Sequence, residues 1–252
     1  MDNHIIYAFL LSTIAGLSTI LGSIVIFFKN KDKNKIINAA LSFASAVMIT
    51  VSLTDLIPES INQLKESYHI IPTIILTLIG LNIGIILSFL IDKYLPENQT
   101  SNNKKLYRIG IISMLAIILH NIPEGMATFM ASTTNITLGI SLTLAIAFHN
   151  IPEGISISVP IYYATNSKMK AIGYTLISGL SELFGAIVTY LFLSKYITNT
   201  IMGILFAIIA GIMTHISIYE LLPTTKKYQD TKTSKKYFII GVGVMILNHI
   251  LF

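Results

Sequence analysis

Long apolar stretches, separated by short polar segments, occupy most of this chain. A helix of about 20 apolar residues is long enough to cross the hydrocarbon core of a bilayer. The pattern therefore predicts eight membrane-spanning helices. Their approximate ranges are 5–28, 36–58, 70–91, 107–131, 137–163, 170–193, 200–222 and 237–252. The last stretch is short and carries Asn248 and His249, so seven spans remain an alternative.

The composition also indicates a membrane protein. Of the 252 residues, 53% are hydrophobic and 12% are charged, and the mean hydropathy is +0.73. The longest polar segment, at about 92–106, is too short to fold alone, so we expect one all-α transmembrane domain over residues 1–252. The first residues lack the basic region of a cleaved signal, and the first apolar stretch is expected to stay as a span.

The basic residues predict the orientation of these spans. Lys and Arg concentrate in cytoplasmic loops, and 15 of the 17 here lie in the first, third, fifth and seventh polar segments. Only Lys65 and Lys195 lie in even-numbered segments. We therefore expect both termini outside the cell membrane. This orientation explains the net charge of +5 without a nucleic-acid partner.

The hexapeptide His-Asn-Ile-Pro-Glu-Gly occurs twice, at His120–Gly125 and at His149–Gly154, inside the fourth and fifth apolar stretches. In each copy His and Glu are four residues apart, so they share one face of a helix. Ionisable groups at membrane depth are costly unless they face a water-filled or metal-filled site. We interpret both pairs as metal ligands on a transport path.

Other residues of the hexapeptides shape the surrounding backbone. Pro123 and Pro152 cannot donate a backbone hydrogen bond, so we expect both helices to kink and to expose a carbonyl oxygen. Gly125 and Gly154 predict close approach of the two hexapeptide helices. Because the fourth and fifth spans run in opposite directions, the motifs should meet in an inverted arrangement.

A second pair of motifs supports this inversion. Asp55-Leu-Ile-Pro58-Glu59 closes the second predicted span, and Glu220-Leu-Leu-Pro223 closes the seventh. By the loop charges, the former lies near the outer face and the latter near the inner face. The pattern predicts an inverted repeat that relates spans one to three to spans six to eight.

A further carboxylate, Glu182, lies in the sixth predicted span among small residues that favour close helix packing. The full set of candidate ligands is His120, Asn121, Glu124, His149, Asn150, Glu153 and Glu182. Such a set is large enough for two adjacent divalent ions, and it suits zinc, iron(II), manganese or cobalt better than copper(I) or calcium. A packing or hydrogen-bonding role is the alternative for Glu182.

With these motifs in place, the chain resembles a bacterial member of the ZIP (Zrt/Irt-like) family of divalent-metal transporters. The resemblance covers the whole chain, and it rests on the eight spans, the two His-Asn-x-Pro-Glu-Gly motifs and Glu182. It implies uptake of zinc into the cytoplasm, often with iron(II), manganese or cobalt as additional substrates. The implied site lies in spans four and five and can hold two metals.

The resemblance also implies two sets of ligands. Glu124, His149 and Glu153 resemble zinc ligands, with His120 nearby. The set that resembles an iron site is Asn121, Glu124, Asn150, Glu153 and Glu182, so Glu124 and Glu153 would bridge the metals. Many family members carry a histidine-rich loop between spans three and four, whereas residues 92–108 contain no histidine here. Metal sensing by such a loop therefore does not follow for this chain.

Two other classes of protein remain open. An intramembrane hydrolase could use the same ligands to activate water, but the chain has no His-Glu-x-x-His motif, and we predict no catalytic residue and no enzyme. A structural membrane protein that holds a metal is the second alternative. We expect divalent metal ions and the lipid bilayer as partners, with no cofactor, and the sequence leaves a homodimer open. Four residues stay open between solvated span ends and a metal path: Asp55, Glu59, His215 and Glu220.

Overall fold

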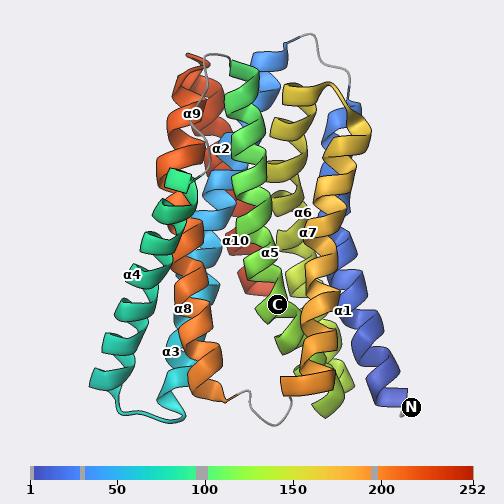
Figure 1. The fold of residues 1–252 in the computed structure, drawn as a ribbon, viewed down its shortest axis with the longest axis vertical. Helices are drawn as coiled ribbons and strands as arrows, with labels where there is room; N and C mark the ends of the chain where they lie inside the picture. The colour runs from blue at the N-terminus through green and yellow to red at the C-terminus, as the bar shows by residue number, and fades with distance from the viewer. Residues whose placement is uncertain (1–2, 29–31, 95–101, 194–197, 252) are drawn as a thin grey trace.

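The computed structural model describes residues 3–28, 32–94, 102–193 and 198–251, and all of the secondary structure in these ranges is helical (Figure 1). The prediction of an all-α fold is confirmed for this part of the chain. The loop residues Lys29, Lys31 and Lys195 lie outside the described residues, as does the middle of the polar segment 92–106.

The chain alternates long helices with short helical turns. The first half consists of α1 (Asn3–Leu21), the 3-10 turn η1 (Gly22–Phe27), α2 (Lys33–Val51), the π-helical turn η2 (Ser52–Leu56), α3 (Ile57–Lys65), α4 (Ile70–Tyr94) and α5 (Asn102–Thr134). The second half consists of α6 (Ile136–Thr165), α7 (Lys168–Val188), the π-helical turn η3 (Thr189–Leu193), α8 (Asn199–Ile216), the π-helical turn η4 (Ser217–Leu221), α9 (Leu222–Lys226) and α10 (Thr231–Leu251).

Seven of the described helical stretches are long and apolar enough to cross a membrane. They are His4–Phe27, Lys33–Lys65, Ile70–Ile91, Asn103–Thr134, Ile136–Thr165, Lys168–Phe192 and Asn199–Lys226. Helix α10 is not among them, because the lysines in its first half and the pair Asn248 and His249 lower its mean hydropathy.

The bundle has an apolar outside and a polar inside. On the outer helix α4, Ile71 is 69% exposed and other large aliphatic side chains are similarly uncovered. In contrast, His120, Asn150, Glu153 and Glu182 are fully buried. This distribution suits a protein whose surface faces lipid, since lipid tails solvate aliphatic side chains and cannot solvate charges.

Helices α5 and α6 form the centre of the bundle. They are joined at Asn135, whose side-chain oxygen caps α6 by accepting hydrogen bonds from the backbone N–H groups of Thr137 and Leu138. Helices α1 and α7 pack against both central helices, and α2 packs mainly against α6 and α10. Helix α4 packs against α8 at the opposite side of the bundle (Figure 1). Both hexapeptides therefore lie inside a ring of helices.

Two of the π-helical turns occupy equivalent places in their helices. Turn η2 interrupts the helical stretch of α2 and α3, and turn η4 interrupts that of α8 and α9. Each begins with a serine, Ser52 or Ser217, whose hydroxyl donates to the carbonyl four residues earlier at 2.7 and 2.8 Å, respectively. Each contains an acidic residue, Asp55 or Glu220, in its fourth position. Such turns widen a helix locally and are frequent at functional sites.

Candidate metal site

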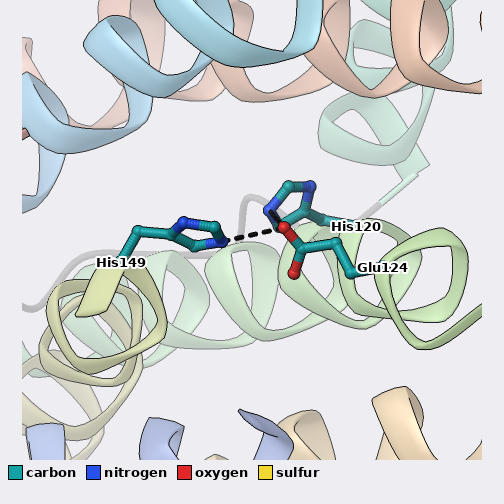
Figure 2. A group of neighbouring side chains, drawn as sticks. All are labelled: His120, Glu124 and His149. Carbon is teal, nitrogen blue, oxygen red and sulfur yellow. Dashed lines mark hydrogen bonds and ion pairs between the residues drawn. The ribbon is translucent and has the colours of Figure 1, made fainter. Parts of the chain in front are cut away.

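Three side chains of the hexapeptides meet in the centre of the bundle. Helix α5 supplies His120 and Glu124, and helix α6 supplies His149 (Figure 2). The Oε1 atom of Glu124 lies 2.8 Å from Nε2 of His149 and 3.0 Å from Nε2 of His120. One ligand atom from each residue lies within 4.8 Å of the others, which is a suitable separation for binding one metal ion. Two imidazole nitrogens and a carboxylate oxygen suit zinc.

The cluster extends to the second glutamate of the motif pair. Glu153 Oε1 lies 3.4 Å from Nε2 of His120, so this histidine contacts both carboxylates. The side chains of His120 and Glu153 are fully buried, whereas those of His149 and Glu124 retain 8% and 7% exposure, respectively. The cluster thus has a deep pair, His120 and Glu153, and an accessible pair, Glu124 and His149, whose side chains retain some exposed surface.

Several oxygen atoms of these residues are buried without any hydrogen-bond partner among the described residues. They are Oδ1 of Asn121, Oε2 of Glu124, Oδ1 of Asn150, both carboxylate oxygens of Glu153, and Oε1 of Glu182. Buried acceptors without a partner are costly, and native structures retain few of them. Their concentration in one place indicates that the cluster is built to receive a cation.

The asparagines and Glu182 connect the hexapeptides to the surrounding helices. The amide of Asn121 donates to the backbone oxygen of Ser178 in α7 at 3.2 Å. The amide of Asn150 donates to the backbone oxygen of Ala15 in α1 and to Oε2 of Glu182 in α7, both at 3.0 Å. These bonds use the nitrogen of each amide and leave its oxygen directed elsewhere. Both oxygens are therefore available as ligands.

Three carboxylates lie close enough to repel one another in this interior. Glu182 interacts electrostatically with both Glu124 and Glu153, and all three side chains are buried. Buried charges of one sign require a compensating charge. The two histidines compensate part of this charge when they are protonated, and a bound cation would compensate more of it.

A cavity of about 470 Å³ leads to the accessible pair. Glu124 and His149 line its inner end, while η2, α3 and α10 supply much of its remaining wall. The polar residues that line it further out are Thr54, Asp55, Glu59, Asn62, Asn248 and His249. A hydrated ion could thus reach Glu124 and His149 without crossing apolar packing.

The place of α10 in the wall of this cavity could not be predicted from the sequence. Nδ1 of His249 lies 2.9 Å from Oδ1 of Asp55, although the two residues are 194 positions apart. His249 is 57% exposed at its side chain and Asp55 is 31% exposed. The polar residues near the chain end were a signal, because Asn248 and His249 interrupt an otherwise apolar stretch, but nothing local specified their partner.

The glycines of the hexapeptides contact different helices from those expected. A Cβ on Gly125 would collide with the backbone of Glu182 in α7, and a Cβ on Gly154 would collide with that of Thr19 in α1. The expectation that these glycines bring the two hexapeptide helices together was therefore wrong. Each glycine follows the glutamate by one residue, which turns it about 100° away from the His and Glu face. The predicted proline kinks stay a prediction.

Two residues that sequence reasoning left open lie toward the other end of the bundle. Glu220 in η4 lies 3.6 Å from Nη1 of Arg108 in α5. Nδ1 of His215 in α8 lies 2.9 Å from the hydroxyl of Ser88 in α4, and its ring stacks on Tyr219. The structure does not bring either residue into the cluster of His120, Glu124 and His149.

The chain is similar in sequence to known zinc transporters. The family model described as ZIP zinc transporter matches residues 96–250, which include both hexapeptides and Glu182. The chain is similar over nearly its whole length to proteins named zinc transporter ZupT. It is 40% identical to that of Campylobacter jejuni, over 97% of this chain and 96% of the relative. It is 38% identical to that of Lysinibacillus sphaericus, over 100% and 99%, respectively. It is 39% identical to that of Chlorobaculum parvum, over all of both chains.

Proposed function

This chain belongs to the ZIP zinc transporter family, and we propose that it takes up zinc across the cell membrane into the cytoplasm. The observation that carries the proposal is the cluster of His120, Glu124 and His149, buried inside a bundle with an apolar outside. An apolar surface of this kind indicates a membrane protein rather than a soluble enzyme. Membership of the family favours a transporter over the intramembrane hydrolase and the structural membrane protein. Zinc is the substrate and passes through the cluster.

The site we propose holds two ions. The first would be bound by Glu124, His149 and Glu153, with His120 adjacent. The second would use the acceptor oxygens of Asn121, Asn150 and Glu182, with Glu124 and Glu153 bridging both ions. The unpaired oxygens of these residues support this assignment. Iron(II), manganese and cobalt accept the same oxygen and nitrogen ligands, so we propose them as additional substrates.

The path we propose begins at the cavity. Asp55, Glu59 and His249 would attract the hydrated cation, because carboxylates at the mouth of a cleft raise the local concentration of cations. The ion would then exchange water for Glu124 and His149 at the inner end. It would leave past Glu182 or along α8 and η4, where His215 and Glu220 lie, respectively. Release of the ion requires that the site does not bind it too strongly. Two ions that share the bridging carboxylates of Glu124 and Glu153 weaken each other's binding.

We further propose one domain of eight spans, with α10 as the eighth and both termini outside. The packing supports an inverted repeat of the first three spans against the last three. Helix α2 packs on α10 as α8 packs on α4, and α1 packs on α6 as α7 packs on α5. Exchanging the two halves thus leaves the pattern of neighbours unchanged. A homodimer in the bilayer is also proposed, with a lipid-facing surface of the bundle as its interface.

Uptake of radioactive zinc into proteoliposomes tests the function. We expect saturable uptake by the wild type, competition by unlabelled iron(II), manganese and cobalt, and no uptake by Glu153→Ala. Glu66→Ala is the matched control, because Glu66 is an exposed carboxylate at the end of α3. Equal fluxes through wild type and Glu153→Ala would remove the cluster from the path. If Glu153→Ala elutes from gel filtration as the wild type does, the variant is folded, and its loss of uptake is a loss of transport.

A further inference from the structure

A second polar pocket lies beside α9. Helix α9 lies near the opposite end of the bundle from α3, which lines the metal cavity (Figure 1). The pocket has a volume of about 110 Å³, and it is lined by Asn34, Lys105, Leu106, Thr224, Lys227 and Tyr228. These residues come from α2, α5 and α9 and from the turn that follows α9. None of them belongs to the metal cluster or to its cavity. The pocket is therefore a separate feature of the molecule.

The charge of this pocket is positive and uncompensated by its own walls. Lys105 and Lys227 both line it, and no acidic residue is among the described residues that line it. Glu220 acts on Lys105 from nearby, but this carboxylate is itself paired with Arg108 at 3.6 Å. Two ammonium groups on one small pocket raise its positive potential, which an anion between them would offset, although Lys227 is exposed and Lys105 is half-buried. The lysines thus point to an anionic ligand.

A buried hydroxyl supports the same conclusion independently. Thr224 is 2% exposed, and its Oγ1 has no hydrogen-bond partner among the described residues. Nearby, Tyr228 is half-buried, and burial raises the pKa of its phenol, so its hydroxyl keeps its proton. Asn34 adds an amide. The walls therefore offer ammonium, hydroxyl and amide donors in one small space, which complements the oxygens of a tetrahedral oxyanion.

We propose that this pocket binds a phosphate group, supplied by the headgroup of an anionic phospholipid or by free inorganic phosphate. The volume admits a single phosphate group and is well below the ~300–1,000 Å³ of pockets for larger organic ligands. Lys105 and Lys227 belong to the polar segments that we assign to the cytoplasmic side. Basic pockets between membrane helices on that side are suited to lipid phosphates. The ligand would bridge α5, which carries His120 and Glu124, to α9 and α2.

Thermal unfolding in detergent tests the proposal. The melting temperature is followed by tyrosine fluorescence, since the chain has 12 tyrosines and no tryptophan. The probes are sodium phosphate, dihexanoyl phosphatidylglycerol, and dihexanoylglycerol as the matched lipid without phosphate. Sodium chloride keeps the ionic strength constant, and EDTA keeps the metal site empty, so failure of the zinc proposal does not affect the result. We expect phosphatidylglycerol to raise the melting temperature by roughly 3 °C or more, and dihexanoylglycerol to have no effect.

Variants show whether this pocket is responsible. Lys105→Gln and Lys227→Gln are expected to remove most of the shift, and Thr224→Val to reduce it while preserving side-chain shape. Lys226→Gln is the matched control, because Lys226 precedes Lys227 but lines a different pocket. A shift with phosphatidylglycerol alone identifies a lipid ligand, and an equal shift with sodium phosphate identifies a free anion.

Two results would overturn the proposal. One is the absence of any shift with either phosphate compound in the wild type. The other is equal loss in Lys226→Gln and Lys227→Gln, which would assign the effect to general surface charge. If a lysine variant does not fold, broadening of the ³¹P NMR signal of either probe by wild type and by Thr224→Val decides the question.

Discussion

The two copies of the hexapeptide have identical residues and different surroundings. In the α5 copy, Glu124 lines the cavity and His120 lies deep; in the α6 copy, His149 lines the cavity and Glu153 lies deep. The amide of Asn121 bonds one helix, α7, whereas that of Asn150 bonds both α1 and α7. The same six letters thus supply an accessible carboxylate in one helix and an accessible imidazole in the other.

The difference follows from direction. Helices α5 and α6 are antiparallel neighbours, so the four-residue step from His to Glu points toward the cavity in α5 and away from it in α6. The histidine of one copy therefore meets the glutamate of the other at the same level. Inversion therefore gives two layers, each with one imidazole and one carboxylate. The layer at the cavity takes its carboxylate from α5 and its imidazole from α6, and the deep layer takes its imidazole from α5 and its carboxylate from α6. A parallel arrangement would place like groups at each level.

The largest expected effect distinguishes the two glutamates. Glu124→Gln removes the carboxylate that contacts both histidines, and we expect zinc affinity to fall by more than roughly 100-fold, beyond the loss typical for outer partners of ligands. Glu153→Gln should lose less, about tenfold in affinity, because its carboxylate lies 3.4 Å from His120, farther than Glu124 lies from either histidine, even though the substitution is expected to stop transport. Isothermal titration of purified protein with zinc measures both. Equal losses would contradict the expectation that the two proposed bridging carboxylates contribute unequally to affinity.

The two histidines should differ less than the glutamates. His149 lines the cavity, so we expect His149→Gln to raise the zinc concentration needed for half-maximal uptake by about tenfold. His120 has no exposed surface, and His120→Gln should mainly lower the maximal rate. Zinc uptake measured over a range of concentrations separates the two effects. If both variants changed the half-maximal zinc concentration and the maximal rate to the same extent, the burial of each histidine would not determine its role in transport.

The two glycines offer a comparison of packing. Gly125→Ala and Gly154→Ala force a methyl group against the backbone of α7 and α1, respectively, and should each destabilise the fold by about 1–3 kcal/mol. Gly173→Ala is the control, because no atom lies within 4 Å of a Cβ there. Alanine in that helix should leave stability unchanged or slightly increase it. Melting temperatures in detergent check the comparison, and a tolerated Gly125→Ala would refute the close contact with α7.

The smallest expected effect separates the two asparagines. Asn150→Ala breaks two hydrogen bonds and Asn121→Ala breaks one, so the former should cost about 1 kcal/mol more in stability. Asn82→Ala is a suitable reference, since this exposed amide donates to the carbonyl of Leu78 in its own helix. Equal melting temperatures for the Asn121 and Asn150 variants would indicate that the bonds to α1 and to Glu182 contribute nothing measurable.

Much of the fold and of the ligand set could be predicted from local patterns. Helix formation follows from apolar stretches of sufficient length, and the His and Glu face follows from helical pitch, because residues four apart lie on one side. Asp55 and Glu220, which the sequence left open between solvated span ends and a metal path, both lie in π-helical turns. The helices that Gly125 and Gly154 contact were not predicted, because a glycine has no side chain whose polarity indicates a partner.

The sequence by itself determined the family and the all-α fold, because composition and spacing of three or four residues act within a single helix. Only the tertiary structure decided which side chains of different helices lie at the same height in the bundle. The contact of Asp55 with His249 joins residues 194 positions apart, and that of Glu124 with His149 depends on the relative heights of α5 and α6. Such contacts depend on how whole helices pack against one another, so every helix in the bundle contributes to them, and no local pattern contains that information.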